Sequence, residues 1–190
     1  VYQRNPDGGE QRWEYDSRGF MTKYTGPLGD VTNYFCDEGG LVTKTVDAHG
    51  LVTLFDYDAA GRKIRTTVDP TGKNAQTQFA YDGNGNLLSV TDPNGILTSY
   101  AYDDVNRLVK VTNGAGNFVQ YTYDQDGRLI QTADSAGGQQ TTTYDCMGRV
   151  VQSMVNTGAG NRTSSFAYDL NGNVVQSVNA DGVVTANIID

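Results

Sequence analysis

The sequence predicts an all-β chain, built as an antiparallel ribbon of β-hairpin repeats that are each 21 to 24 residues long. Three observations lead to this prediction. A Tyr-Asp pair recurs at a fixed period along the whole chain, and each repeat carries two Asp-x-x-Gly-like turns. The segments between turns are short runs rich in β-forming residues, too short for ordinary helices.

The period is carried by eight copies of the pair, or a one-residue variant of it, spaced by 21, 21, 24, 21, 21, 21 and 24 residues. They are Tyr15-Asp16, Cys36-Asp37, Tyr57-Asp58, Tyr81-Asp82, Tyr102-Asp103, Tyr123-Asp124, Tyr144-Asp145 and Tyr168-Asp169. A glycine stands four residues after the Tyr position in seven copies, and Asn106 replaces it in the eighth. An aromatic residue stands two residues before the Tyr position in seven copies, with Thr142 as the exception.

Each repeat is expected to run strand, turn, strand, turn, as in residues 86–103. The strand 86–91 is followed by the turn 92–95, in which Asp caps the turn amides, Pro presets the second position and Gly supplies a positive φ. The strand 96–102 then ends at the Tyr, and the next Asp begins the other turn. About 17 strands are expected in all, so the sheet must curl, pack on itself or rely on further protein.

An odd period of 21 residues constrains the turns, because side chains alternate faces along a strand while the aromatic columns should return to one face. We therefore expect two unlike turns: a two-residue loop after the Tyr-Asp pair and a three-residue, bulged loop at the second turn. Phe79 and Tyr100 should then share a face, and Arg107 should lie opposite Tyr123 as a cation–π neighbour.

The two 24-residue repeats add three residues near Asp69 to Gln76 and near Asn156 to Thr163. We expect these additions to lengthen the second loop from three residues to about six. The face opposite the rings should carry a polar centre line eight residues after each Tyr position. Its members are Lys23, Lys44, Arg65, Ser89, Lys110, Gln131, Gln152 and Gln176.

Composition limits the partners of the chain. A net charge of −8 over 190 residues, with no Lys/Arg cluster, argues against nucleic acid and anionic membrane surfaces. No apolar run approaches the roughly 18 residues of a membrane span.

Cys36 and Cys146 lie five repeats apart, about 48 Å along a sheet at two strands per repeat, so we expect no disulfide. The cysteines do not indicate a compartment.

The chain is interpreted as one array, residues 1–190, of about eight to nine repeats, truncated at both ends. Val1 is not a start methionine, Asn5-Pro6-Asp7-Gly8 matches the second turn of a preceding repeat, and Asp190 falls where a ninth Asp is due. We therefore expect both ends to cut through repeats.

The segment Tyr121-Thr122-Tyr123-Asp124-Gln125-Asp126-Gly127-Arg128-Leu129 resembles the consensus of the RHS or YD repeat family, and the resemblance extends along essentially the whole chain. Cys36, Asn106, Thr142 and Ile188-Ile189-Asp190 depart from it. The resemblance implies a curved segment of a β-ribbon that spirals into a hollow shell. In bacterial members, including insecticidal toxin complexes and type VI secretion effectors, such a shell encloses a toxic C-terminal polypeptide. Animal relatives, the teneurins, use a similar barrel in adhesion receptors.

Several residues have the type that a chemical site needs, but their positions are typical of turns. His49 is the sole histidine and is interpreted as a turn residue. Asp124-Gln125-Asp126-Gly127 begins like a calcium loop but lacks the closing glutamate, and Asn84-Gly85-Asn86 and Asn171-Gly172-Asn173 are turns without a following helix to bind phosphate. Asn161-Arg162-Thr163 fits a glycan acceptor, which matters only in a secreted eukaryotic protein. No zinc ligand set occurs. We therefore assign no catalytic, cofactor-binding or metal site and expect no cofactor.

The leading interpretation is a structural, non-enzymatic shell segment of an exported bacterial protein, either secreted or at the cell surface. Its expected partners are the remainder of its own polypeptide, comprising further repeats and a toxin cargo, and a secretion-system component. The alternative is a cell-surface adhesion or carbohydrate-binding module, because exposed rings can stack on sugars. Exposed strand edges can also pair with another copy of the chain. The sequence leaves open the identity of the cargo, the organism, and the sheet face that lines the cavity.

Overall fold

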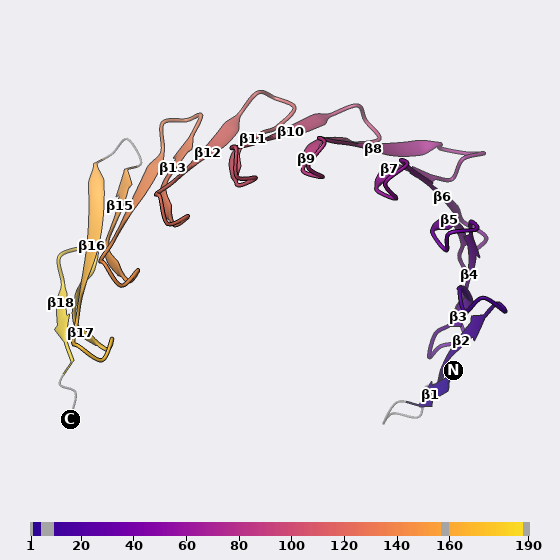
Figure 1. Ribbon diagram of the computed structural model, residues 1–190, viewed down its shortest axis with the longest axis horizontal. Coiled ribbons are helices and arrows are strands. Elements are labelled where there is room, and N and C mark those ends of the chain that lie inside the picture. Colours follow the sequence, from indigo (N-terminus) through magenta and orange to yellow (C-terminus); the bar gives the residue numbers. More distant parts are fainter. Residues whose placement is uncertain (1, 5–9, 157–159, 188–190) are drawn as a thin grey trace. The chain divides into compact units, whose positions relative to one another are not determined.

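The computed structural model describes residues 2–4, 10–156 and 160–187, and every regular element among them is a β-strand (Figure 1). The strands are β1 (Tyr2–Arg4), β2 (Glu10–Tyr15), β3 (Met21–Thr25), β4 (Val31–Cys36), β5 (Val42–Val46), β6 (Val52–Tyr57), β7 (Lys63–Val68), β8 (Ala75–Tyr81), β9 (Leu87–Thr91), β10 (Leu97–Tyr102), β11 (Leu108–Thr112), β12 (Phe118–Tyr123), β13 (Leu129–Asp134), β14 (Gln139–Tyr144), β15 (Val150–Asn156), β16 (Asn161–Tyr168), β17 (Val174–Val178) and β18 (Val184–Ala186). The all-β prediction is confirmed.

The chain divides into two compact units, Val1–Leu97 and Thr98–Asp190. Within the first unit each strand from β1 to β9 pairs antiparallel with the next along the chain. Within the second unit the same holds from β10 to β18. Each unit is therefore a meander of hairpins, as the repeat pattern predicts.

The aromatic columns return to one face within each unit. In the second unit Tyr100 lies opposite Val111, Val111 lies opposite Val119, and Tyr121 is two residues farther along the same strand. Cross-strand partners share a face, as do residues two apart, so Tyr100 and Tyr121 lie on the same face. We call this the aromatic face.

The same path connects the rings of the first unit, where Phe55 pairs with Thr66, Thr66 pairs with Thr77, and Phe79 follows two residues later. Phe79 and Tyr100 themselves belong to different units, so the expectation that they share a face stays a prediction.

The two turns of a repeat have the same geometry, so the prediction of unlike turns is wrong. At the first turn the Asp103 N–H donates to Arg107 O at 3.0 Å, and the Asn106 N–H donates to Asp103 O at 3.0 Å. At the second turn the Asn113 N–H donates to Asn117 O at 2.9 Å. The Asp103–Arg107 and Asn113–Asn117 hydrogen bonds each enclose a three-residue loop. Both loops begin with an Asp or Asn cap and end with a residue at positive φ, so similar sequences form similar turns.

A β-bulge in the strand after each first turn restores the face of the rings. Tyr102 pairs with Leu108, whereas the preceding residue Ala101 pairs with Lys110, which leaves Val109 as an extra residue. The extra residue changes the parity of the repeat once, so two identical turns become compatible with an odd period. The equivalent residues are Thr22, Thr43, Ile64, Leu88, Val109, Ile130, Val151 and Val175.

The three residues added to a long repeat lie at the second turn, as predicted, but they do not all enlarge the loop. In the β7–β8 hairpin four residue pairs extend to Val68 and Ala75, compared with three in β11–β12. The Asn74 N–H donates to Asp69 O at 2.7 Å and encloses four loop residues instead of three. Two added residues thus extend the strands and one enlarges the turn. In the other long repeat, residues 157–159 of the loop lie outside the described residues.

The sheet has no hydrophobic core in the part of the chain that is described. No hydrophobic side chain there is buried, and Thr67, at 5% exposure, is the one buried polar residue. Most rings of the aromatic columns are half-buried. The opposite face carries the predicted polar centre line, since Lys110 pairs with Ala101 and Gln131 pairs with Thr122. Each described unit is a single layer, and it must be stabilised by contacts within that layer.

Candidate functional site

The first turn of each repeat is organised by the carboxylate of its Asp. At Asp124, Oδ1 accepts hydrogen bonds from the N–H groups of Asp126 at 3.0 Å and Arg128 at 2.9 Å, while the main-chain oxygen accepts the N–H of Gly127 at 3.1 Å. One side chain therefore satisfies two of the amides that a tight turn exposes. Asn113 and Asn179 make the same contacts at second turns through their amide oxygens.

An arginine after the first turn connects one repeat to the next. Arg128 Nε donates to Asp124 Oδ2 at 2.6 Å, and its Nη1 reaches the main-chain oxygen of Asp145 in the following repeat at 3.4 Å. The guanidinium lies 5.1 Å from the ring centroid of Tyr144. The Tyr144 hydroxyl donates to Leu129 O at 2.9 Å. We call this set of Asp, Arg and the next Tyr the repeat clasp.

The repeat clasp recurs wherever an arginine follows the first turn. The guanidinium groups of Arg62, Arg107, Arg128 and Arg149 lie 4.5 to 5.1 Å from the ring centroids of the next Tyr. The predicted cation–π contact between Arg107 and Tyr123 is therefore confirmed, at 4.8 Å. A hydroxyl donates to a main-chain oxygen of the preceding repeat at Tyr57, Tyr81, Tyr123, Tyr144 and Tyr168, among others. The hydroxyl contact was not foreseen from the sequence.

The first repeat forms a modified clasp, because Phe20 occupies the position of the arginine. Arg18, inside the turn, takes over: its Nη2 lies 2.9 Å from Asp16 Oδ2, and its guanidinium lies 4.8 Å from the Phe20 ring centroid. Its Nη1 reaches Asp37 O at 3.5 Å. The link between repeats thus survives the loss of the usual residue.

The clasps also hold the carboxylates in their charged form. The hydrogen bond from the Arg149 N–H is the largest cause that lowers the pKa of Asp145, and the Arg149 guanidinium acts in the same direction against desolvation. The pKa is likewise lowered at Asp16, Asp58, Asp82, Asp103, Asp124 and Asp169. These shifts follow from turn and clasp contacts, so they describe structural carboxylates.

The residues considered above as a catalytic base, calcium ligands or a phosphate site lie in turns. His49 is exposed, and its N–H donates to Asp47 Oδ1 at 2.8 Å. Asp124 and Asp126, the candidate calcium ligands, both form ion pairs with Arg128, at 2.6 and 2.8 Å. Asn84 and Asn171 each donate an N–H to the Asp that caps their turn. Among the residues that the structure describes, no group of three His, Cys, Asp or Glu residues is placed to hold a metal ion.

The remaining candidates are the two cysteines and the glycan acceptor sequence. Cys36 and Cys146 are both free thiols. Asn161 is exposed at the start of β16, and the neighbouring Arg162 pairs with Asp181 at 2.6 Å. Asn5-Pro6-Asp7-Gly8 and Ile188-Ile189-Asp190 lie outside the described residues. The described chain also contains no helix with the length and apolarity needed to cross a membrane.

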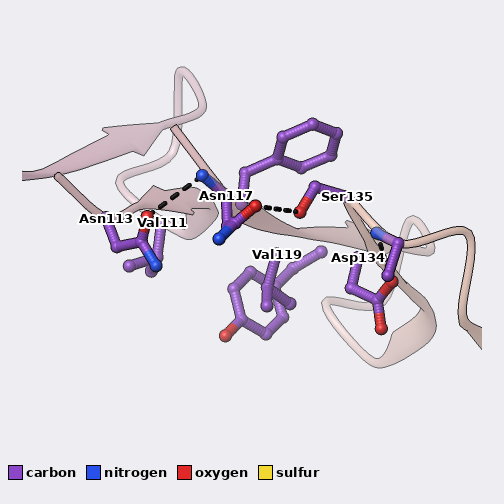
Figure 2. Close-up of a pocket in the computed structure, with 9 residues that line it drawn as sticks. Val111, Asn113, Asn117, Val119, Asp134 and Ser135 are labelled. Carbon is purple, nitrogen blue, oxygen red and sulfur yellow. Dashed lines mark hydrogen bonds between the residues drawn. The ribbon is translucent and has the colours of Figure 1, made fainter. Parts of the chain in front are cut away.

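A hollow of about 530 Å³ opens in the second unit beside Tyr121, and we call it the Tyr121 hollow. Its apolar lining comes from Val111, Phe118, Val119, Tyr121 and Ala136, and its polar lining from Asn113, Asn117, Asp134 and Ser135. Figure 2 shows Asn117 and Ser135 facing each other across two neighbouring turns, where the Ser135 hydroxyl donates to Asn117 Oδ1 at 3.3 Å. The lining residues come from two repeats, so no single motif of the sequence marks this place.

Comparison with known proteins places these features in a family context. The model of the family described as RHS Repeat matches residues 37–73, 81–117 and 102–140, just over half of the chain. The double-stranded DNA deaminase toxin A of Burkholderia cenocepacia (strain H111) is 34% identical over 92 residues, which cover 48% of this chain and 6% of that protein. The chain therefore matches a small part of that relative's length.

Two crystal structures share the fold. TcdB2-TccC3 without its hypervariable C-terminal region matches with a TM-score of 0.72 and 18% identity, over 94% of this chain and 12% of that one. TcdB2-TccC3-Cdc42 matches with a TM-score of 0.70 and 16% identity, over 94% and 11%. At these identities the likeness concerns the fold alone.

Proposed function

Because this chain belongs to the RHS repeat family, we propose that it is a structural, non-enzymatic wall segment of an exported protein that encloses and delivers a toxic C-terminal polypeptide. Two relatives support this proposal. One is named a DNA deaminase toxin, and the other is a TcdB2-TccC3 protein whose C-terminal region is described as hypervariable. A constant wall joined to a variable cargo would account for both descriptions.

The observation that carries the proposal is the repeat clasp in a sheet without a core. A globular enzyme or binding domain is stabilised by buried side chains, and none of the described hydrophobic side chains is buried here. The clasps instead join several repeats to the next one in sequence, at Arg62, Arg107, Arg128 and Arg149, so the structure can be extended by adding repeats. A thin, extendable sheet of this kind is suited to surrounding a volume.

The partners we propose follow from the same reasoning. The aromatic face leaves half-exposed rings that further repeats or the enclosed polypeptide would cover. A component of a secretion system, such as a type VI system, would export the assembly. The net charge of −8 disfavours nucleic acid and anionic membranes as partners of this segment. We further propose that the segment contributes no catalytic residue and binds no cofactor, so any toxic activity would reside in the cargo.

Limited proteolysis of the complete protein that contains this segment tests the proposal. The cargo should resist protease while the wall is intact and should become sensitive when three clasps are removed together by Arg107→Ala, Arg128→Ala and Arg149→Ala. A matched triple variant at exposed polar positions, Gln125→Ala, Asn171→Ala and Gln139→Ala, should stay protected. A cargo that is digested at the same rate in the wild-type protein and in the clasp variant would contradict enclosure.

A surface adhesion or carbohydrate-binding module is the second candidate. The observation in its favour is the aromatic face, since half-exposed rings such as Tyr121 can stack on sugar rings. Saturable binding of the chain on a glycan array, lost on substitution of Tyr121 by alanine, would favour this function. An array without saturable binding would exclude it.

A further inference from the structure

The aromatic face of the second unit has an interruption in its row of rings. Consecutive repeats place Tyr121, Thr142 and Phe166 at the same position, so the middle repeat supplies no ring. The Tyr121 hollow is lined by the first of these three residues, Tyr121, and it adjoins a second hollow of about 250 Å³; Thr142 lines neither of them. The two hollows share Val119 and Asp134 and together extend from Val111 to Val155. They mark a stretch of the aromatic face that the chain itself leaves unfilled.

The size and floor of the Tyr121 hollow suit an aromatic side chain. A cavity of about 150 Å³ lined by apolar groups is large enough to bind benzene, whereas this hollow measures about 530 Å³. Val111, Val119 and the ring of Tyr121 line its aromatic-face side. Another ring can stack on Tyr121 in an offset or edge-to-face arrangement, as adjacent aromatic residues do.

The rim of the hollow favours a basic neighbour for that ring. Asp134 Oδ1 is occupied by the N–H groups of Ala136 and Gly138, each at 2.9 Å. Asp134 Oδ2 has no hydrogen-bond partner among the described residues, and Asp134 is exposed. No described residue that lines either hollow is Lys or Arg. The site therefore carries an uncompensated carboxylate at the edge of an apolar floor.

We propose that the Tyr121 hollow binds an aromatic side chain of the polypeptide that the wall encloses, with an adjacent Lys or Arg of that polypeptide paired to Asp134. The inference rests on the proposed function for the source of the segment. An extended segment would lay its ring on Val119 and Tyr121, which line the hollow. The amides of Asn113 and Asn117, on the turn edge, can donate to the main chain of such a segment. A sugar would need more hydrogen-bonding groups over the floor, which is formed by two valines and a tyrosine ring.

Binding is tested with the 190-residue chain and a fluorescein-labelled heptapeptide of glycine and serine that carries a central tryptophan flanked by two lysines. Fluorescence anisotropy should show saturable binding with a Kd of about 1 mM or tighter. A peptide with alanine in place of tryptophan should show no saturation. A peptide with glutamate in place of both lysines should bind more weakly, since its charges repel Asp134.

Two variants of the chain locate the site. Val119→Phe fills the hollow from within and should weaken binding by about tenfold or more. Thr53→Phe introduces the same ring at the equivalent position of the first unit and should leave binding unchanged. Asp134→Asn keeps the turn cap, because Asn113 caps its own turn in the same way. Asp134→Asn should lower the affinity of the lysine peptide by about two- to fivefold, the range of an exposed ion pair. It should leave unchanged the affinity of a peptide with serine in place of both lysines.

Three results would overturn the proposal: equal affinity of Val119→Phe and the wild-type chain, equal affinity of the alanine and tryptophan peptides, or saturable binding of methyl α-glucoside that Val119→Phe abolishes. The last result would assign the hollow to a sugar. Enclosure is judged separately by the protease experiment on the complete protein. A protected cargo with no ring binding would refute this inference and leave the proposed function intact.

Discussion

The hydroxyl of Tyr123 provides a sharp test of the repeat clasp. Tyr123→Phe removes one oxygen atom, whose hydrogen bond to Leu108 O measures 2.9 Å, and leaves in place the ring that lies 4.8 Å from the Arg107 guanidinium carbon. Tyr121 is a matched control in the same strand and on the same face. Its hydroxyl has no hydrogen-bond partner among the described residues.

The expected loss for Tyr123→Phe is about 1 kcal/mol of unfolding free energy, because a hydrogen bond of this kind contributes about 0.5 to 1.5 kcal/mol. With an m-value of about 3 kcal/mol/M in urea, the unfolding midpoint should fall by about 0.3 M. Circular dichroism during a urea titration measures the midpoint. Tyr121→Phe should leave it unchanged within about 0.1 M.

A stabilising role of the Tyr123 hydroxyl is refuted if the two variants unfold at the same urea concentration, or if Tyr121→Phe is the less stable of the two. Either result would mean that the hydroxyl contact to the preceding repeat does not stabilise the array. Amide hydrogen exchange at Leu108 and Lys110 provides a local check, since protection there should fall in Tyr123→Phe alone.

Three further predictions concern acid, the turn glycines and the bulge. The pKa of Asp103 is lowered from 3.8, and the hydrogen bond from the Arg107 N–H is the largest cause. A carboxylate of this kind stabilises the fold fully above the pKa of the unfolded state. It loses that contribution as the pH falls through the lower pKa of the folded state. The urea midpoint should therefore drop below about pH 4, and Asp103→Asn should flatten this dependence. Gly148 has φ +80°, and Arg128 Nη1 lies 3.6 Å from the position that an added methyl group would take, so Gly148→Ala should lower the unfolding free energy by about 1 to 2 kcal/mol. Gly83 has open space around it and no positive φ, so Gly83→Ala should be nearly neutral. Thermal unfolding compares the two variants. Deletion of the bulge residue Val109 should invert the faces of the following strand and abolish the folded NMR spectrum of the second unit, while deletion of Ala115 from a turn should leave most resonances in place.

Much of the fold could be predicted from the repeat alone. The Asp and Gly positions located the turns, the two-residue spacing of the rings required them to share a face, and the residue eight after each Tyr fell on the other face. The contact of Arg107 with Tyr123 was also predictable, because both residues hold fixed positions in the period. These features depend on local chemistry and on alternation along a strand, which a sequence displays directly.

The bulge, the clasp and the hollow could not be predicted in the same way. A repeat with an odd number of residues needs one extra residue that reverses the alternation of faces. That residue can lie in a turn or in a strand. The bulge residues, such as Thr22, Ile64 and Val109, are ordinary strand residues with no distinguishing type. The hydroxyl contacts of the clasp join a side chain to a main-chain oxygen, and a main-chain acceptor has no sequence signature.

The sequence by itself therefore determined the period, the strands, the turn chemistry and the common face of the rings, because each is set within a few residues of the chain. The tertiary structure decided that both turns are alike, that a strand bulge corrects their parity, and that Arg128 reaches the carbonyl of Asp145. It also decided where the aromatic face is left open. These outcomes depend on which strands lie side by side and in which register, and register is a property of pairs of segments.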